Sequence, residues 1–271
     1  MEIKLIALDM DGTLLNSNVE ITQFTKDTIK KAQESGIHVA ICTGRFPENV
    51  HIILDDMDIH CDVISLNGAV VDADGKRIFS AFLPEEDTKN VYNILEEHDA
   101  KYILFKDHKI YTRKPDTIYH AEKFYGDRMH DEYGVDFLRG EEAVKNAIDG
   151  GISKFFVFDD DTDSLDIVYD VVKTLPQIDV TRSGRKNFEV MPMGISKATG
   201  LKKLAEHYNI PIENTMAVGD HENDLSMIEV AGLSVAMANA IDLVKNAADV
   251  ITQSNDDDGA AKAIIKYALK G

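Results

Sequence analysis

Ile3-Lys4-Leu5-Ile6-Ala7-Leu8-Asp9-Met10-Asp11-Gly12-Thr13 is the stretch of sequence that decides the fold. Its first six residues are mostly apolar, which is typical of a buried strand, and the chain turns polar at Asp9. Ligands of open α/β sheets bind at the carboxyl ends of the strands. Two carboxylates at such an end are unfavourable unless a cation shares the space, so the stretch predicts a divalent metal site. A solvated loop with incidental acids is the alternative interpretation.

The two acids of this stretch also suit phosphoryl-transfer chemistry. A carboxylate beside Mg²⁺ can attack phosphorus, and a second carboxylate nearby can transfer the proton. Asp9 and Asp11 lie two residues apart at the end of the predicted strand. They are therefore the candidate catalytic residues.

Length and charge limit the classes of protein to which the chain can belong. Its 271 residues allow one large domain or two smaller ones, and a hydrophobic content of 44% supports a sizeable core rather than disorder. The formal net charge of -19 argues against general binding to nucleic acid or to anionic membranes. A small anionic substrate is compatible with this charge, because a metal ion and a lysine can reverse the potential locally.

The cysteines and the N-terminal residues bear on the compartment. Cys42 and Cys61 are the only cysteines in the sequence, and they form neither a C-x-x-C pair nor a metal-binding spacing. Two reduced, buried thiols are therefore expected. The first residues lack the pattern of a signal peptide, and no apolar run has the length of a membrane span. We expect a cytoplasmic protein.

Strands and helices are predicted to alternate at both ends of the chain. Apolar runs typical of buried strands are separated by segments with helical periodicity, and Thr22 and Gly36 provide start and stop signals for the first helix. This alternation predicts an α/β fold with a Rossmann-like parallel sheet and right-handed crossovers. The strands predicted after the first comprise residues 37–42, 63–66, 215–218, 233–236 and 249–251.

The middle of the chain has a different rhythm of hairpins and helices. We interpret residues 83–188 as an inserted α+β cap domain, and residues 1–82 and 189–271 as the catalytic core. The elements predicted within the insertion include a hairpin at residues 102–112 and a helix at residues 116–130.

Polar residues follow several separate elements of the predicted core. Because strand ends on one edge of a parallel sheet lie close together, residues far apart in the sequence can share one site. Phosphoryl transfer needs a metal ion, hydroxyl and backbone N–H donors for the phosphoryl oxygens, and an ammonium group to balance charge. The residues that can supply these groups, besides Asp9 and Asp11, are Thr43, Gly44, Lys197, Gly219, Asp220, Asn223 and Asp224.

These runs resemble the motifs of a known superfamily. The presence of Asp11 two residues after Asp9 is a feature in which the chain resembles the phosphatases of that superfamily. Other features resemble its Cof-type (subclass IIB) sugar phosphatases, namely the large insertion and the runs Asn67-Gly68-Ala69 and Asp258-Gly259-Ala260-Ala261. The runs similar, in this order, to the four motifs of the haloacid dehalogenase (HAD) superfamily are Asp9-Met10-Asp11-Gly12-Thr13-Leu14, Thr43-Gly44-Arg45, Lys197 and Gly219-Asp220-His221-Glu222-Asn223-Asp224.

The resemblance implies Mg²⁺ as the cofactor and a role for each matching residue. Asp9 is implied to be the nucleophile and a Mg²⁺ ligand, and Asp11 the acid/base that also offers its backbone carbonyl to the metal. Asp220 is implied to be the further metal ligand, and Asp224 to hold metal-bound water or Lys197. The residues implied to bind the phosphoryl group are Thr43, Gly44, Lys197 and Asn223.

The predicted function is that of a Mg²⁺-dependent phosphatase that hydrolyses small phosphomonoesters through an aspartyl-phosphate intermediate, with sugar phosphates implied by the resemblance. One alternative is a phosphomutase of the same superfamily. Another is a phospho-accepting signalling domain, although the later acidic motif comes too late in the chain for that class. Arg45 is expected either to reach the substrate or to form a surface salt bridge. The expected partner is a small phosphorylated metabolite, with no nucleic acid and no membrane, for a monomer or dimer.

Overall fold

The chain folds into two compact units. The computed structural model describes residues 2–114, 117 and 120–269. The first unit comprises Met1–Arg45, Ile53–Phe79 and Ser196–Gly271, and the second comprises Phe46–Ile52 and Ser80–Ile195. The second unit thus takes in Phe46–Ile52, which the sequence did not assign to the insertion.

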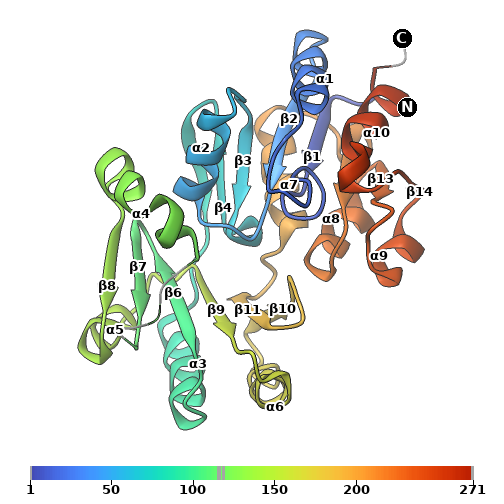
Figure 1. Ribbon diagram of the computed structural model, residues 1–271. Helices are drawn as coiled ribbons and strands as arrows, with labels where there is room; N and C mark the ends of the chain where they lie inside the picture. Colours follow the sequence, from blue (N-terminus) through green and yellow to red (C-terminus); the bar gives the residue numbers. More distant parts are fainter. Residues whose placement is uncertain (1, 115–116, 118–119, 270–271) are drawn as a thin grey trace. The chain divides into compact units, whose positions relative to one another are not determined.

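A sheet of eight strands, counted over the described residues, forms the centre of the first unit (Figure 1). The strands are β1 (Leu5–Leu8), β2 (His38–Cys42), β3 (Asp62–Ser65), β4 (Val70–Ala73), β5 (Lys76–Ser80), β12 (Thr215–Gly219), β13 (Leu233–Ala236) and β14 (Val250–Ile251). Their order is β14-β13-β12-β1-β2-β3-β4-β5. Neighbouring strands are parallel from β14 to β3, and β3 and β4 are antiparallel. The predicted α/β class with a parallel core sheet is confirmed.

Strand β1 lies in the middle of this sheet, and all four of its apolar residues are buried. Leu8, its last residue, pairs with Ile41 of β2 on one side and with Val218 of β12 on the other. The backbone N–H of Asp9 continues the pairing by donating to the Val218 carbonyl over 3.0 Å. The carboxyl ends of these three strands therefore lie side by side, and so do the loops that follow them.

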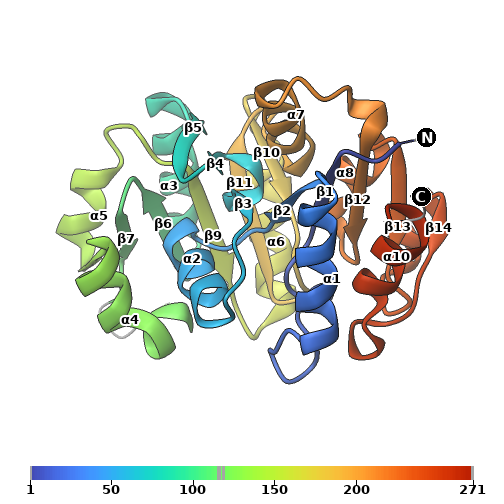
Figure 2. The same cartoon turned by 90° about the horizontal axis from the view of Figure 1, so that it is seen from above.

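Helices cover both faces of this sheet. Figure 2 shows α1 (Gln23–Glu34) and α10 (Gly259–Tyr267) on one face and α7 (Lys197–His207) and α8 (Leu225–Val230) on the other. Thr22 caps α1 as predicted, because its hydroxyl accepts a hydrogen bond from the Thr25 N–H over 3.1 Å. Two further helices are α2 (Pro47–Asp56), which spans the boundary between the two units, and α9 (Asp242–Ala247), which belongs to the first unit.

The second unit contains a mixed sheet. Its strands are β6 (Tyr102–Lys106), β7 (Lys109–Thr112), β8 (Asp136–Arg139), β9 (Lys154–Phe158), β10 (Ile178–Thr181) and β11 (Asn187–Pro192). They lie in the order β10-β11-β9-β6-β7-β8, with β7 and β8 parallel and the other neighbours antiparallel. The antiparallel pairing of β6 with β7 confirms the hairpin predicted at residues 102–112.

An apolar core stabilises the second unit. Leu95, Leu104, Phe155 and Phe188 are fully buried in one cluster, which joins helices to the sheet. The helices of this unit are α3 (Glu85–Glu97), α4 (His120–Tyr133), α5 (Glu141–Ala147) and α6 (Thr162–Val172).

Two elements of the second unit were missed by the sequence analysis. Strand β8 is a short edge strand, and its sequence, Asp136-Phe137-Leu138-Arg139, lacks the alternation of apolar and polar residues that reveals a strand. Helix α5 has only seven residues, too few to establish a helical period. The helix predicted at residues 116–130 corresponds to α4, and residues 116, 118 and 119 of that prediction lie outside the described residues.

Within the part of the chain that the structure describes, no helix is both long and apolar enough to cross a membrane.

The central position of β1 predicts a large loss of stability on truncation of Ile6. Ile6 is fully buried, so Ile6→Ala should lower the free energy of unfolding by about 3 kcal/mol. Ile251, on the edge strand β14, is 55% exposed, and Ile251→Ala should change the free energy by less than about 1 kcal/mol. Urea denaturation followed by circular dichroism measures both values. Equal losses in the two variants would contradict the central placement of β1.

Candidate active site

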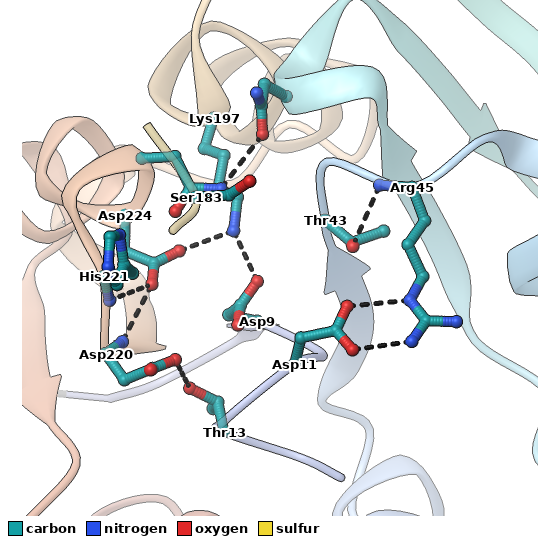
Figure 3. A network of polar contacts seen from close by, with 12 residues as sticks. Asp9, Asp11, Thr13, Thr43, Arg45, Ser183, Lys197, Asp220, His221 and Asp224 are labelled. Atoms are coloured by element: carbon teal, nitrogen blue, oxygen red, sulfur yellow. Dashed lines mark hydrogen bonds and ion pairs between the residues drawn. The ribbon is translucent and has the colours of Figure 1, made fainter. Parts of the chain in front are cut away.

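The Asp9 carboxylate lies at the carboxyl end of the central strand. Only 5% of Asp9 is exposed, and its Oδ1 accepts a hydrogen bond from Lys197 Nζ over 2.5 Å (Figure 3). Burial and the nearby Asp224 carboxylate raise the pKa of Asp9 well above its ordinary value, against the opposing effect of Lys197. A further cation beside Asp9 would therefore be strongly favourable.

Lys197 is the first residue of α7 and is fully buried. Its ammonium group lies between two carboxylates, 2.5 Å from Asp9 Oδ1 and 2.5 Å from Asp224 Oδ1. Burial disfavours the charged ammonium, but the carboxylates of Asp224 and Asp9 outweigh this effect and raise the pKa of Lys197. The lysine is therefore a fixed positive charge and not a proton donor at neutral pH.

The Asp224 carboxylate holds Lys197 and shapes the loop that precedes it. Its Oδ1 binds Lys197, and its Oδ2 accepts hydrogen bonds from the backbone N–H groups of Asp220 (2.8 Å) and His221 (2.9 Å). Both carboxylate oxygens are thus engaged by the protein itself. This geometry corresponds to the implied contact with Lys197.

Asp220 faces the loop that follows β1. The hydroxyl of Thr13 donates to Asp220 Oδ1 over 2.9 Å, and a Cβ atom at Gly12 would lie only 2.5 Å from Asp220 Oδ2. Gly12 also has φ of +81°, a conformation that favours glycine. Burial and the Asp224 carboxylate raise the pKa of Asp220 to about 6. The backbone at Gly12 therefore packs directly against the Asp220 side chain.

Three carboxylates meet at a point where a metal ion can be held. Ligand atoms of Asp9, Asp220 and Asp224 all lie within 4.8 Å of one another. Their donor set consists of oxygen atoms, which hard divalent cations such as Mg²⁺ prefer. Burial, together with the nearby Asp224 carboxylate, raises the pKa values of Asp9 and Asp220, and a bound cation would favour their charged forms. The residues present therefore fit a divalent metal.

The second acid of the opening stretch points elsewhere. Asp11 is exposed, and its carboxylate forms a two-pronged ion pair with Arg45, at 2.7 Å from Nε to Oδ2 and 2.6 Å from Nη2 to Oδ1 (Figure 3). The geometry thus corresponds to the salt-bridge alternative for Arg45. Contact of Arg45 with a substrate stays a prediction.

Thr43, Gly44 and Asn223 surround the same edge of the sheet. Thr43 is 1% exposed, and its hydroxyl accepts a hydrogen bond from the Arg45 N–H over 3.2 Å. Gly44 follows it and is half-buried. Asn223 lies in the loop after β12 and donates from Nδ2 to Asn67 Oδ1 over 3.2 Å. Asn67 was recognised as part of a motif, but the sequence alone assigned it no role.

A buried cysteine lies beside these groups without the features of a nucleophile. Cys42, the last residue of β2, is fully buried, and burial raises the pKa of its thiol despite the nearby charge of Lys197. The thiol is therefore neutral at ordinary pH. The expectation of a reduced, buried thiol holds for Cys42, whereas Cys61 is only partly buried.

Comparison with known proteins identifies the family. The model of a family described as haloacid dehalogenase-like hydrolases matches residues 6–264. The chain belongs to this family. The resemblance inferred from the four motifs is thereby confirmed.

Two curated relatives that match over nearly the full length are named as phosphatases. The chain is 33% identical over 276 residues to 5-amino-6-(5-phospho-D-ribitylamino)uracil phosphatase YwtE of Bacillus subtilis (strain 168), with 96% of each chain covered. It is 31% identical to Phosphatase YwpJ of the same organism, over 98% of this chain and 100% of the relative. The chain is thus a phosphatase of the HAD superfamily, which replaces the alternative of a signalling domain.

Solved structures share the whole fold. A haloacid dehalogenase-like hydrolase from B. subtilis is 29% identical with a TM-score of 0.84, covering 98% of this chain and 99% of that one. The HAD subclass IIB sugar phosphatase BT4131 is 26% identical with a TM-score of 0.82, covering 97% and 98%. The chain therefore has the subclass IIB architecture, a parallel core sheet with a second, mixed sheet. We call the second unit the cap.

Crowding of carboxylates predicts a pH-dependent stability of the metal-free protein. Because the pKa of Asp220 is raised to about 6, the folded state binds its proton more tightly than the unfolded chain does. The contribution of Asp220 to stability therefore falls as the pH rises from about 4 to 6. Asp220→Asn removes this titration, so at pH 7 the variant should be more stable than the wild type by roughly 2–3 kcal/mol. Below about pH 4 the two proteins should be equally stable.

Urea denaturation in the presence of a chelator, repeated from pH 4 to pH 8, measures this difference. Added Mg²⁺ should stabilise the wild type at pH 7 more than it stabilises Asp220→Asn. A stability difference between the two proteins that is constant over the pH range would contradict the placement of a crowded Asp220.

Proposed function

We propose that the chain is a Mg²⁺-dependent phosphatase that hydrolyses phosphomonoesters of small polyhydroxylated metabolites, sugar phosphates among them, through a phosphorylated Asp9. The observation that carries this proposal is the buried Asp9 carboxylate, which Lys197 holds at 2.5 Å beside the further acids Asp220 and Asp224. A carboxylate fixed in this way is a ready nucleophile for phosphorus.

The proposed metal site consists of Asp9 and Asp220, with the backbone carbonyl of Asp11. HAD phosphatases use a divalent metal, and the oxygen donors suit Mg²⁺. When bound, Mg²⁺ neutralises charge on the phosphoryl oxygens. Asp224 stays outside this set in the proposal, because both of its oxygens already bind Lys197 and backbone N–H groups.

In the first proposed step, a carboxylate oxygen of Asp9 forms a bond to phosphorus while the bond from phosphorus to the leaving oxygen breaks. The proposed donors to the phosphoryl oxygens are the Lys197 ammonium, the Thr43 hydroxyl, the Gly44 N–H and the Asn223 amide. Asp11 donates its proton to the leaving oxygen, so that the product is a neutral alcohol.

In the second step, water attacks the phosphorus of phosphorylated Asp9. The Asp11 carboxylate accepts the proton from this water, and the bond between phosphorus and Asp9 breaks, which releases inorganic phosphate. Both oxygens of Asp11 are bound by Arg45 in the structure. Proton transfer through Asp11 therefore requires that this ion pair opens.

The substrate class is proposed from the relatives and from the chemistry of the cap. One relative acts on a phosphorylated ribityl compound and one solved structure is a sugar phosphatase, and both names describe phosphates of polyhydroxylated carbon chains. Asp9, Lys197 and Asp220 can recognise only phosphate and metal. Residues of the cap must then distinguish one leaving group from another.

The cap contains polar groups of the kind that bind hydroxyls. Lys154 of β9 and Glu189 of β11 form a buried ion pair over 2.7 Å, and the Ser183 hydroxyl donates to Glu189 over 2.6 Å. We propose that the cap, which includes Glu189 as well as the insertion predicted at residues 83–188, acts as a specificity domain for the catalytic core.

Substitution of the two catalytic acids tests the mechanism. Asp9→Asn should lower turnover by about 10³-fold or more, because an amide is a poor nucleophile. Asp11→Asn should still react with p-nitrophenyl phosphate, whose leaving group needs no proton, but hydrolysis of phosphorylated Asp9 should then be slow. A burst of nitrophenol followed by slow turnover, with trapped phosphoprotein, is the expected result.

Asp242→Asn is the matched control, because Asp242 is an exposed acid of α9 in the same unit, and it should leave turnover unchanged. Substantial turnover by the Asp9→Asn variant would refute the role of Asp9. Hydrolysis of alkyl phosphates by the Asp11→Asn variant at the wild-type rate would refute the role of Asp11. Release of inorganic phosphate, rather than return of the phosphoryl group to substrate, distinguishes a phosphatase from a phosphomutase. A chelator should abolish activity, and Mg²⁺ should restore it.

Exchange of the cap tests where specificity lies. Replacing residues 80–195, the larger of the two segments of the cap, by the corresponding segment of YwtE should change the ranking of kcat/KM across a panel of phosphorylated metabolites to that of YwtE. The Mg²⁺ requirement and labelling of Asp9 should persist, because the core is unchanged. An unchanged ranking in a folded chimaera would show that the core determines specificity.

A further inference from the structure

The turn that joins β3 to β4 has an unusual backbone. Leu66, Asn67 and Gly68 have φ angles of +46°, +53° and +92°, so three successive residues lie in the left-handed region. Leucine rarely adopts this region, because its Cβ approaches the following carbonyl oxygen. All three residues are buried. Backbone strain of this kind persists only where the surrounding structure imposes it, and it is concentrated at functional sites.

The first contact of this turn is with the loop that follows β2. The Leu66 N–H donates to the Arg45 carbonyl over 3.0 Å, and the Asn67 N–H donates to the Thr43 carbonyl over 3.0 Å. These two bonds fix the backbone on either side of Gly44. The turn thereby orients the segment that is proposed to donate to the phosphoryl oxygens.

The second contact is with the start of α7. A Cβ atom at Gly68 would lie 2.1 Å from the carbonyl oxygen of Ser196, the residue before Lys197. A Cβ atom at Gly200, in the first turn of α7, would lie 3.0 Å from the Cα atom of Gly68 and 2.3 Å from Cγ2 of Ile64 in β3. The turn and the helix therefore approach through glycines on both sides. This approach fixes Lys197 relative to the loop after β2.

The third contact is made by the Asn67 side chain. Asn67 is 2% exposed, and its Oδ1 accepts the hydrogen bond from Asn223 Nδ2 over 3.2 Å. Asn223 lies between Asp220 and Asp224 in sequence, in the loop that holds both acids. One buried turn thus contacts all three segments that surround Asp9 in the proposed phosphoryl site.

We propose that Asn67 is a positioning residue that orients the Asn223 amide toward the phosphoryl group. The left-handed turn places the side-chain Oδ1 of Asn67 so that it accepts a hydrogen bond from the side-chain Nδ2 of Asn223. The orientation of the Asn223 amide is thereby fixed before the substrate binds, which reduces the entropy lost on binding. This inference rests on the proposed function, since it assigns Asn223 to phosphate.

Asn67→Gly separates the backbone role from the side-chain role. Glycine adopts the left-handed conformation without strain, so the turn and the melting temperature should be retained or improved. The loss of the amide should weaken binding of inorganic phosphate, measured by calorimetry in the presence of Mg²⁺, by roughly tenfold, and kcat/KM for p-nitrophenyl phosphate similarly.

Asn209→Gly is the matched control. Asn209 follows α7 with φ of +54° and is exposed, so this substitution also removes an amide from a left-handed position. It should leave phosphate binding and turnover unchanged.

A double-substitution cycle tests whether Asn67 acts through Asn223. In an Asn223→Ala background, Asn67→Gly should reduce phosphate affinity by less than about twofold, because the partner is already absent. Independent, multiplicative losses would overturn the inference, and so would wild-type phosphate affinity in Asn67→Gly.

The two proposals can fail separately. If the wild type binds phosphate but hydrolyses no phosphomonoester, the proposed function fails, whereas the phosphate affinities of wild type and Asn67→Gly still decide the role of Asn67. If the wild type hydrolyses phosphomonoesters and Asn67→Gly matches it in affinity and kcat/KM, only the role of Asn67 fails. If the wild type binds no phosphate, the role of Asn67 is overturned as well.

Discussion

The buried ammonium group of Lys197 between Asp9 and Asp224 is the interaction on which the rest of the site depends. An ion removed from water is tolerated only when opposite charges and good geometry compensate for the lost hydration. Here two carboxylates lie 2.5 Å from one ammonium, and Asp220 adds a further negative charge nearby. The cluster therefore has an excess of negative charge, which suits the binding of a cation and, through it, of an anionic phosphoryl group.

The core fold holds this cluster from several directions. Asp9 and Lys197 are 188 positions apart in the sequence, and they meet because β1 and α7 belong to one layered sheet structure. The loop after β13 then ties the two acidic loops together. Asn239 Nδ2 donates to the Gly12 carbonyl over 2.8 Å, and the Ile241 N–H donates to the Asp220 carbonyl over 3.0 Å. The spacing between the acids is thus held by hydrogen bonds to the backbone carbonyls of both acidic loops.

The parts of this structure that follow from local patterns or from general rules of sheet topology could be predicted, and the parts that depend on side-chain packing could not. The apolar run before Asp9 identified β1, and the rule for strand ends brought Asp9, Lys197 and Asp220 to one edge. The pairing of Asp11 with Arg45 depends on side-chain rotamers, for which the sequence contains no signal. The left-handed conformation of Leu66 contradicts its local preference and results from contacts with distant segments. The short edge strand β8 was missed because its pairing with β7, and not its own sequence pattern, defines it.

The burial of Cys42 has a consequence for the redox tolerance of the enzyme. Oxidants and alkylating reagents attack the thiolate, and burial keeps this thiol neutral and away from solvent. The groups proposed to carry out the reaction are carboxylates, an ammonium, a hydroxyl and amides, which peroxide does not modify under ordinary conditions. Cys42 directly precedes Thr43 in the sequence. Oxidants should nevertheless leave the catalytic groups intact as long as the Cys42 thiol stays buried.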